Sequence, residues 1–475
     1  MQHLTFLENY YDGKLSEKFV DDATGKYYTH LLVAKHLITA LLATYKHNET
    51  DISTINIADP FAGDGRLLEL LIRTWVESNL PNVKWDVSIW DVNGDGLNTA
   101  KSSLDKLSDL GISLDYKSVH NDSFATALNN KNSFDIVISN PPWELLKPDA
   151  RYLKEMPEDI KTQYIEEIRQ YDSFLADHYP ESQPRMKFGG WGTNLSRVGV
   201  DVCRTICKPD GKIAIVMPAS FLADSQSATI RQSLFQKYTL IDAAYFPAEA
   251  KLYGKADIAS ATLVLSSDHS GTDMEPLLTL YDYNLDIREQ STVLFSTETL
   301  QHSQYTLPVS IGPKASLLLS KLSLANPKFK ELENGSDQSL WCGRELDETG
   351  KSSWLVTSGD GPMFVNGGLI NRYQLDNSIV QTVQKNDDWN QPKSVNFERI
   401  VWRDISRPNQ KRRMIATIIP PGYVTGNSLG VAHLKKDDPE LLRILLAIMN
   451  SLCFEFQLRA RSATGHISLA SLREV

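Results

Sequence analysis

The segment FDIVISNPPW (residues 134–143) places an amide, two prolines and a tryptophan at the end of an apolar run. The run predicts a buried strand, and the prolines must end it because proline lacks the N–H that a central strand needs. In parallel α/β sheets, the carboxyl ends of strands form the edge where ligands bind. The side-chain oxygen of Asn140 and the carbonyl of Pro141 would be two fixed acceptors there, with Trp143 beside them. Such a group can hold both hydrogens of an amine and stack a flat ring, although the residues alone also fit an ordinary strand-ending turn.

A second motif, DPFAGDG (residues 59–65), follows an earlier apolar run and precedes an amphipathic helix. Its two glycines allow a tight turn and a close approach of the main chain to a ligand. Asp91 and Asp122 follow the next two strands. Carboxylates at successive strand ends suit a ligand with ribose hydroxyls and an adenine amine, such as S-adenosylmethionine. The acceptors at Asn140 and Pro141 would then orient the N6 amine of a target adenine toward the methyl group of this cofactor.

Two other patterns were weighed as metal sites. DVNGDG (residues 91–96) fits the start of an EF-hand loop, but the twelfth position would be Ser102 instead of glutamate, and a strand precedes it. Cys203 and Cys207 lie one helical turn apart, and the other two cysteines are remote in sequence. We therefore expect these cysteines to pack in a core, and we expect no metal site.

Apolar runs that alternate with helical or turn segments predict an α/β fold with a doubly wound sheet. The expected strands are INIADPF, WDVSIWD, FDIVISN, GKIAIVMP, LIDAAYF and ASATLVLS, starting near residues 55, 85, 134, 211, 240 and 259. A polar segment at 266–276 marks the first boundary, and a clear helix is predicted at 438–456. The charged stretch between Trp143 and Gly189 predicts a solvated helical insertion, with a substrate gate as the alternative.

Charge is distributed unevenly along the chain. The net charge is −10, yet residues 372–475 contain 15 Lys and Arg against 10 Asp and Glu, which leaves −15 for the rest. This asymmetry is typical of an acidic catalytic domain followed by a domain that binds a polyanion. No apolar run approaches the roughly 18 residues of a membrane span, and the amino-terminal residues lack a signal pattern. We therefore expect a cytoplasmic protein without a membrane segment.

In their order, the motifs TGKYYTHLLVAKHL, DPFAGDG and NPPW resemble the gamma arrangement of TaqI-type and Eco57I-type DNA adenine N6-methyltransferases from restriction–modification systems. The resemblance implies an S-adenosylmethionine-dependent methyltransferase (Rossmann-like) sheet with a carboxyl-terminal α+β target-recognition domain. It divides the chain into a catalytic domain at 1–266, a connecting segment at 267–310 and a target-recognition domain at 311–475. The implied reaction is methyl transfer from S-adenosylmethionine to the N6 amino group of an adenine flipped out of duplex DNA.

The resemblance also implies a role for each motif residue. The implied catalytic residues are Asn140, Pro141, Trp143 and Tyr253. The implied cofactor-binding residues are Tyr28, Thr29, Asp59, Pro60, Ala62, Gly63, Gly65, Asp91, Asp122, Phe124 and Asn140. Within this set, Asp59 would contact the amino-acid moiety, Asp91 the ribose hydroxyls and Asp122 the adenine amine. Tyr253 would pair with Trp143 around the flipped base, with Phe246 as its competitor for that role.

The segment at 399–428 resembles part of a target-recognition domain and carries a cluster of basic residues. The implied DNA-binding residues are Arg403, Arg407, Lys411, Arg412 and Arg413. Basic side chains near aromatic ones suit phosphate and groove contacts, and a solvated basic turn is the alternative.

Several other functions use the same asparagine–proline–proline–aromatic chemistry. They are N4-cytosine methylation of DNA and methylation of an RNA amine or a protein glutamine. The long basic carboxyl-terminal part favours duplex DNA, and Asn140 in place of serine favours adenine. A non-enzymatic specificity subunit is the remaining alternative, against which the intact Asn140, Trp143, Asp59 and Asp91 argue. Because no nuclease motif is evident in the sequence, any cleavage would belong to a separate restriction endonuclease.

Overall fold

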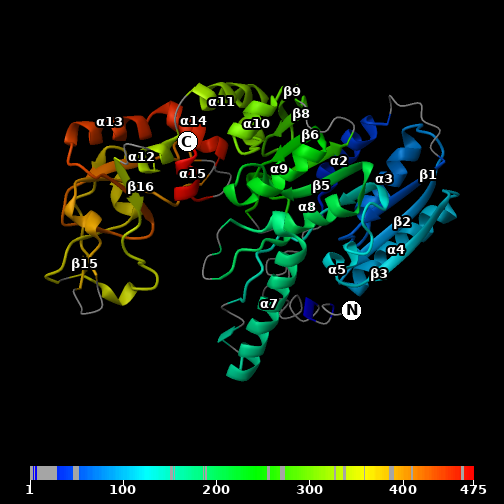
Figure 1. Cartoon of the computed structure of the whole chain (residues 1–475), viewed down its shortest axis with the longest axis horizontal. Coiled ribbons are helices and arrows are strands. Elements are labelled where there is room, and N and C mark those ends of the chain that lie inside the picture. The colour runs from blue at the N-terminus through cyan, green and yellow to red at the C-terminus, as the bar shows by residue number, and fades with distance from the viewer. Residues whose placement is uncertain are drawn as a thin grey trace. The chain divides into compact units, whose positions relative to one another are not determined.

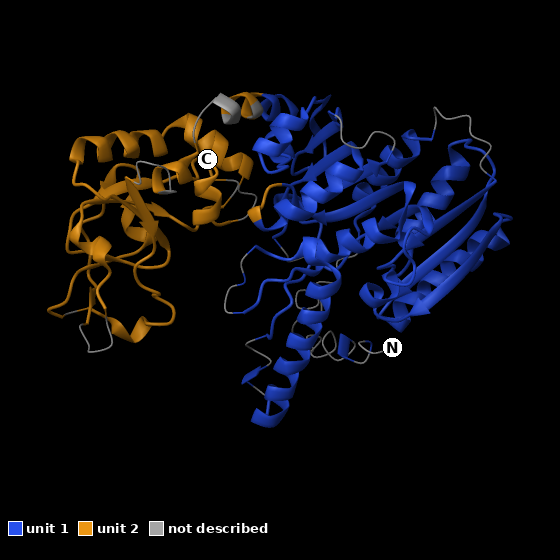
Figure 2. Cartoon of the chain, viewed as in Figure 1, with its two compact units in different colours: residues 1–222, 226–317 blue, residues 223–225, 318–475 orange. Residues whose placement is uncertain are grey.

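The chain forms two compact units (Figure 2). Unit 1 comprises residues 1–222 and 226–317, and unit 2 comprises residues 223–225 and 318–475. The computed structural model describes residues 4, 6–7, 29–45, 53–149, 153–154, 156–185, 187, 190–253, 257–267, 273–325, 328–334, 339–357, 359–384, 390–407, 410–461 and 465–475.

Nine strands of unit 1 form one sheet in the order β3-β2-β1-β4-β5-β7-β6-β8-β9 (Figure 1). They are β1 (Thr54–Asp59), β2 (Lys84–Asp91), β3 (Leu114–His120), β4 (Phe134–Ser139), β5 (Cys207–Pro218), β6 (Thr239–Phe246), β7 (Ser260–Ser266), β8 (Leu277–Tyr281) and β9 (Ile287–Thr292). The pairings among β1 to β5 are parallel, whereas β7 runs antiparallel to β5 and β6. This sheet confirms the predicted doubly wound α/β fold of a Rossmann-like methyltransferase.

The chain changes direction across the sheet beside β1. From β1 it proceeds outward through β2 to β3, and it then returns to add β4 on the other side of β1. The loops after β1 and β4 therefore diverge, which leaves the crevice in which open α/β sheets bind ligands. Asp59 is the last residue of β1, and Asn140 follows the last residue of β4. The topology alone thus brings two predicted motifs to this crevice.

Helices cover both faces of the sheet of unit 1. One hydrophobic cluster contains α2 (Leu31–Ala43), α3 (Arg66–Glu77) and α4 (Gly94–Asp109). The other contains α5 (Ser123–Ala127), α7 (Glu158–His178), α8 (Leu195–Ile206), α9 (Ala228–Lys237) and part of α10 (Thr297–His302). Ile136 and Ile138 of β4 belong to the first cluster and Val137 to the second, because successive side chains of a strand point to opposite faces.

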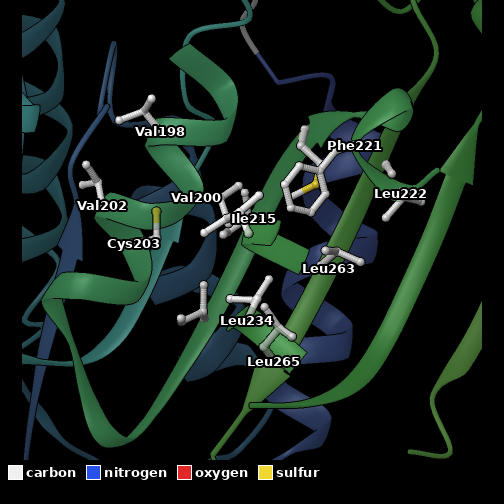
Figure 3. Packing of buried hydrophobic residues seen from close by; sticks show 14 of the residues in the cluster. Val198, Val200, Val202, Cys203, Ile215, Phe221, Leu222, Leu234, Leu263 and Leu265 are labelled. Atoms are coloured by element: carbon white, nitrogen blue, oxygen red, sulfur yellow. The ribbon is translucent and has the colours of Figure 1, made fainter. Parts of the chain in front are cut away.

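The second cluster is closely packed around α8 and β5 (Figure 3). Val198 and Cys203 of α8 gather there with Ile215 of β5 and with side chains of β7 and α9. Cys203 and Cys207 are both buried in this cluster, which confirms the predicted core packing of the two cysteines.

The division between the units differs from the predicted boundary at residue 266. The segment 267–310, expected to be a connection, contributes β8 and β9 to the large sheet, and unit 1 continues to residue 317. β8 pairs in parallel with β6, so its backbone hydrogen bonds lie within the sheet. β9 is largely exposed, and its sequence, IREQST, lacks the apolar run that marks an inner strand.

The charged stretch after Trp143 forms α7, a helix of 21 residues, which confirms the predicted helical insertion. Five of its residues are buried, and the others are at least partly exposed. The buried residues are Tyr164, Ile168, Tyr171, Asp172 and Leu175, which recur at intervals of three or four and so lie on one face of the helix.

Unit 2 is built around a four-stranded antiparallel sheet in the order β10-β19-β16-β17. These strands are β10 (Leu340–Gly343), β16 (Arg399–Arg403), β17 (Ala416–Ile419) and β19 (Leu429–Leu434). The helices are α12 (Phe329–Asn334), α13 (Pro439–Met449), α14 (Leu452–Arg461) and α15 (Leu469–Arg473), and α11 (Pro313–Ala325) spans residue 317. Two-residue strands complete the unit: β11 (Leu355–Val356), β12 (Phe364–Val365), β13 (Ile370–Asn371), β14 (Gln374–Leu375), β15 (Thr382–Val383) and β18 (Val424–Thr425). The predicted α+β class of this region is confirmed.

The single helix predicted at 438–456 is broken into α13 and α14, which bend by 60° against each other. Asn450 lies at the break, where its side chain donates to the carbonyl of Ala416 (3.0 Å) and accepts from the N–H of Ala416 (3.2 Å). These two bonds to β17 fix the break. Among the described residues, no single helix is long and apolar enough to cross a membrane, although α13 and α14 taken together reach that length and apolarity.

Candidate active site

A pocket opens at the carboxyl edge of the sheet in unit 1, beside β1 and β4. Its empty volume, including the open mouth, is about 900 Å³. The predicted residues that line it are Thr29, Asp59, Ala62, Gly63, Asp91, Asp122, Phe124, Asn140 and Pro141. Pro60 and Gly65 do not line the pocket but belong to the loop that forms its wall, and Tyr28 lies outside the described residues. The fold therefore gathers residues from five separate segments of the chain into one cavity.

The DPFAGDG loop is bonded to the end of β2. The N–H of Ala62 donates to the carbonyl of Trp90 (3.0 Å), and the N–H of Gly63 donates to Oδ2 of Asp91 (2.8 Å). Helix α4 packs directly on the loop, because a Cβ on Gly96 would lie only 2.8 Å from the carbonyl oxygen of Gly63. These contacts hold the loop close to the pocket and leave no room for a side chain at Gly96.

Asp91 shapes this wall in addition to lining the pocket. Its Oδ1 accepts from the N–H of Asn93 (2.8 Å), and the side chain of Asn93 in turn caps the first turn of α4. The DVNGDG motif is therefore a strand end followed by a helix cap, not an ion-binding loop. Among the residues that the structure describes, no group of three or more His, Cys, Asp or Glu could hold a metal ion.

Asp59 joins the ends of β1 and β4. Its Oδ1 accepts from the hydroxyl of Ser139 (2.6 Å) and from the N–H of Phe61 (3.1 Å). Burial raises the pKa of Asp59 to about 7, and these two hydrogen bonds oppose the shift only in part. A cationic ligand group in the pocket would favour the ionised form of this carboxyl.

Asp122 lines the pocket, and its two carboxylate oxygens have different partners. Its Oδ1 accepts from the N–H of Phe124 (2.9 Å) and from the hydroxyl of Tyr171 (3.1 Å). Its Oδ2 is buried and makes no hydrogen bond of normal geometry to a described residue, although the N–H of Ala125 lies near enough to the carboxylate to lower its pKa. Since buried polar atoms are normally paired, an orphan acceptor in a pocket fits a donor supplied by a ligand. Burial raises the pKa of Asp122 to about 6, so the carboxyl is mainly an ionised acceptor at neutral pH.

Asn140 is held by the segment that leads into α2. Its side-chain Nδ2 donates to the hydroxyl of Thr29 (3.1 Å), which points the nitrogen end of the amide at Thr29 and keeps Oδ1 as the acceptor end. Pro141 packs against α8, where a Cβ on Gly199 would lie 2.3 Å from the Cβ of Pro141. The loop that carries Asn140 and Pro141 is thus fixed on both sides, which suits two rigid acceptors.

The ring of Trp143 contacts the ring of Tyr253 rather than that of Phe246. The centroids of Trp143 and Tyr253 are 4.6 Å apart at an interplanar angle of 64°. Phe246 is fully buried and stacks on Tyr281 (4.6 Å, 13°). The contact between Trp143 and Tyr253 leaves no space for a base between them, so a base that stacks there must displace one of the rings.

Other pocket residues were not singled out from the sequence. Phe61 and Asn93 line the pocket, and the ring of Phe61 packs against that of Phe124 (centroids 5.1 Å apart). Both belong to motifs that had been recognised, so their positions within DPFAGDG and DVNGDG were the available signal. Leu7 also lines the pocket, although it lies outside every recognised motif. No local pattern marks it.

The structure divides the predicted basic cluster in unit 2. Arg407 and Lys411 are exposed. Arg403 and Arg412 are partly exposed, and each donates to a main-chain carbonyl. Arg413 is only 1% exposed, and its guanidinium donates to the carbonyl of Ser406 (3.0 Å). The expectation that Arg413 contacts DNA is therefore wrong, because its buried guanidinium donates a hydrogen bond within the turn.

Residues 77–253 match the family model described as Eco57I restriction-modification methylase. The matched segment runs from the end of α3 to Tyr253 and so includes Asp91, Asp122 and the NPPW motif. This match supports S-adenosylmethionine as the cofactor. No curated protein sequence matches the chain significantly.

Solved structures of restriction–modification enzymes resemble the chain. The type IIG restriction endonuclease BpuSI aligns at 12% identity over 94% of this chain and 58% of its own, with a TM-score of 0.45. The type IIL enzyme MmeI in complex with DNA aligns at 10% identity over 97% and 70% of the two chains, with a TM-score of 0.51. A nuclease-deletion mutant of the type ISP enzyme LlaGI aligns at 10% identity over 98% and 46%, with a TM-score of 0.52. The chain spans less than two thirds of the length of BpuSI, and identities this low support the fold alone.

Proposed function

The chain carries an Eco57I-type restriction–modification methylase domain at residues 77–253, and we propose that it methylates the N6 amine of adenine in duplex DNA. One observation carries this proposal: a single pocket is lined both by Asp59, Asp91 and Asp122 and by Asn140 and Pro141. Residues suited to hold S-adenosylmethionine and residues suited to hold an exocyclic amine therefore meet at one edge of the sheet.

The donors and acceptors of the pocket fit the parts of S-adenosylmethionine. The orphan Oδ2 of Asp122 suits the adenine amine, and Phe61 and Phe124 offer rings beside it. The Asp91 carboxylate suits the ribose hydroxyls, and Asp59 lies where it would favour the cationic amino-acid end. When bound, S-adenosylmethionine supplies an electrophilic methyl group. The protein contributes position and electrostatics, which is the usual division of labour with a cofactor.

The catalytic loop would act on the target base. The Oδ1 of Asn140 and the carbonyl of Pro141 accept the two hydrogens of the amine and turn its lone pair toward the methyl group. Asn140 and Pro141 would hold the amine in the orientation that methyl transfer requires, and the amine proton that is given up would leave to solvent. No covalent enzyme intermediate is needed. Trp143 and Tyr253 would hold the flipped base by stacking.

Unit 2 would read the DNA, with Arg407 and Lys411 in contact with phosphates. In such a restriction–modification system the protein would work in the cytoplasm, where its DNA lies, and cleavage would belong to a separate restriction endonuclease.

The substrate class is tested by offering labelled S-adenosylmethionine with duplex DNA, ribosomal RNA or cell protein in separate reactions. We expect label in DNA only. Label in RNA or in protein would refute the proposal.

The affinity for S-adenosylhomocysteine is expected to fall as the pH is lowered below about 6. The pKa of Asp122 in the free protein is raised to about 6 by burial, and a ligand amine needs the ionised carboxylate. Below this pKa, binding must release a proton, so the dissociation constant should rise by up to about tenfold for each unit by which the pH is lowered. Asp59, with its pKa raised to about 7, acts in the same direction. Calorimetric titrations between pH 5 and 8 measure this dependence.

The replacement Asp122→Asn is the control, because the amide does not titrate and the steepest part of the dependence should disappear. An affinity that stays constant from pH 5 to 8 in the unaltered protein would contradict the assignment of Asp122.

The ligand-free protein should show the opposite trend in stability. Its raised carboxyl pKa values mean that the folded state binds more protons than the unfolded state between pH 4 and 7, so this contribution to stability is lost as the pH rises.

Replacing both Arg407 and Lys411 by alanine is expected to weaken DNA binding and to flatten its dependence on salt. Each phosphate contact contributes a slope of about −0.9 to the logarithm of the binding constant against the logarithm of salt concentration, so the slope should fall by about 2. Fluorescence anisotropy with a duplex at several salt concentrations measures it. The exposed residues Lys106 and Lys131 of unit 1 provide the matched control pair. An unchanged slope in the variant that lacks Arg407 and Lys411 would show that these two residues do not contact DNA phosphates.

A further inference from the structure

Helix α7 belongs to an insertion that begins directly after the catalytic loop. The two ends of the insertion lie together, since Leu145 pairs with Asn194 in an isolated antiparallel bridge and the N–H of Leu146 donates to the carbonyl of Thr193 (2.9 Å). The side chain of Asn194 then caps α8. The described residues of the insertion add no strand to the large sheet, and the role of the insertion is inferred here from their contacts.

Two tyrosines of this insertion reach the wall of the pocket. Tyr171 of α7 donates its hydroxyl to Oδ1 of Asp122 (3.1 Å). Tyr179, at the carboxyl end of α7, donates its hydroxyl to the carbonyl of Phe124 (2.6 Å). Each tyrosine is only 1% exposed. Asp122 and Phe124, the two residues assigned to the adenine of the cofactor, therefore each accept a hydrogen bond from the insertion.

The bond from Tyr171 engages Oδ1 of Asp122, which favours Oδ2 as the oxygen that accepts from a ligand. Oδ1 already accepts from the N–H of Phe124, and the second bond fixes the rotation of the carboxylate. Oδ2, for which the structure gives no hydrogen-bond partner among the described residues, is the oxygen left to accept from a ligand, and Asp122 lines the pocket. Tyr171 is itself held by packing, because the rings of Phe6 (5.2 Å) and Phe174 (5.8 Å) lie against it.

We propose that Tyr171 is a positioning residue that makes the pocket selective for a 6-aminopurine over a 6-oxopurine in the cofactor. The proposal rests on the proposed function as an S-adenosylmethionine-dependent enzyme. An adenine presents a donor to Oδ2 of Asp122, whereas a 6-oxopurine presents an acceptor, and two facing acceptors repel each other. The hydrogen bond from Tyr171 also lowers the pKa of Asp122 against the larger raising effect of burial, which favours the acceptor form.

The test compares the binding of S-adenosylhomocysteine and S-inosylhomocysteine, which differ at purine position 6, to the full-length chain by calorimetry. The unaltered protein should prefer the adenosyl ligand by about tenfold or more. Tyr171→Phe keeps the ring and removes the hydroxyl, and it should reduce this preference by about threefold to tenfold. If Tyr171 had a purely structural role, its replacement would weaken the binding of both ligands equally. A preserved ratio would therefore overturn the proposal.

A second variant tests the same geometry in the opposite direction. In Asp122→Asn, the oxygen of the amide should stay on Phe124 and Tyr171, so that Nδ2 faces the pocket as a donor. The preference should then turn toward the inosyl ligand, and Tyr171→Phe added to this variant should weaken the reversal. An Asp122→Asn protein that still prefers the adenosyl ligand would contradict the proposed orientation.

Tyr164→Phe is the matched control, because Tyr164 is buried on the same helix and Asp122 takes its side-chain bond from Tyr171 instead. Its preference between the two ligands should be unchanged. The proposed cofactor and the proposed role of Tyr171 are contradicted by different results. If the unaltered protein binds neither ligand, the proposed cofactor and this inference fall together. If it prefers the adenosyl ligand and Tyr171→Phe retains the full preference, the inference alone fails.

Discussion

Replacing Asn140 by alanine is expected to lower the rate of methyl transfer at saturating cofactor by about 100-fold to 1,000-fold. The side-chain oxygen of Asn140 is one of two acceptors proposed to hold the target amine, and Thr29 and Pro141 fix the loop on either side of it. Removing a fixed polar group that acts on the reacting atoms typically has an effect of this size. S-adenosylhomocysteine should still bind within about threefold, because the main polar contacts proposed for it come from Asp59, Asp91 and Asp122.

Single-turnover kinetics and calorimetry on the same preparation measure the two effects. Asn129→Ala is the matched control, because Asn129 is an exposed asparagine of the same unit, and neither quantity should change. If Asn140→Ala loses cofactor binding and turnover to the same degree, the residue supports the fold of the pocket. In that case its proposed role as an acceptor for the amine would be rejected.

Replacing Gly65 by alanine is expected to lower the free energy of unfolding by about 2–5 kcal/mol. Gly65 has a φ of +76° at the start of α3, a conformation that alanine adopts with strain. An added Cβ would also lie 2.7 Å from the Cβ of Ala100 and 2.9 Å from its Cα, so α4 would have to move. Because α4 and the glycine loop share a wall of the pocket, cofactor affinity should fall as well. Urea unfolding of the full chain measures the stability.

Gly111→Ala separates the two causes. Gly111 has a φ of +85°, but a Cβ there would meet nothing within 4 Å, so only the backbone strain of about 1–2 kcal/mol should appear. The difference between the two variants is the effect of the close approach of α4. Equal losses in both would show that the contact with Ala100 does not constrain the loop.

Most strands of the large sheet could be predicted from the sequence, because buried strands of an α/β sheet read as continuous apolar runs. The exceptions were informative. β3 (LDYKSVH) and β9 (IREQST) form the two edges of the sheet, and their side chains are largely exposed. Without an apolar run they resemble loops. β8 (LLTLY) does carry an apolar run but is also absent from the predicted strands, so the predicted domain boundary lies before β8 and β9 instead of after them.

The residues of the pocket could be predicted because they lie at strand ends in recognisable motifs. Asp59, Asp91, Asp122 and Asn140 all line it. Contacts between distant segments had no local signature. The bond from Tyr171 to Asp122 joins residues 49 positions apart, and the charged sequence of α7 gave no sign that its buried face supports the pocket.

The basic cluster shows a different limit of the sequence. The run Lys411-Arg412-Arg413 predicts positive charge but not its direction, because neighbouring side chains around a turn point to different sides. In the structure Lys411 faces solvent, whereas Arg413 is buried. Glu455 accepts from the main-chain N–H of Arg413 (2.9 Å), a bond from α14 that the sequence spacing could not reveal.

The identity of the methylated nucleoside is the most direct test of the proposed function. The purified chain would be incubated with unmethylated genomic DNA and labelled S-adenosylmethionine, and the DNA would then be digested to nucleosides and separated. We expect label in N6-methyldeoxyadenosine, and none when Asn140 is replaced by alanine. Label in N4-methyldeoxycytidine would preserve the chemistry of Asn140 and Pro141 but contradict the target base. DNA that remains unlabelled would contradict the proposed function as a whole.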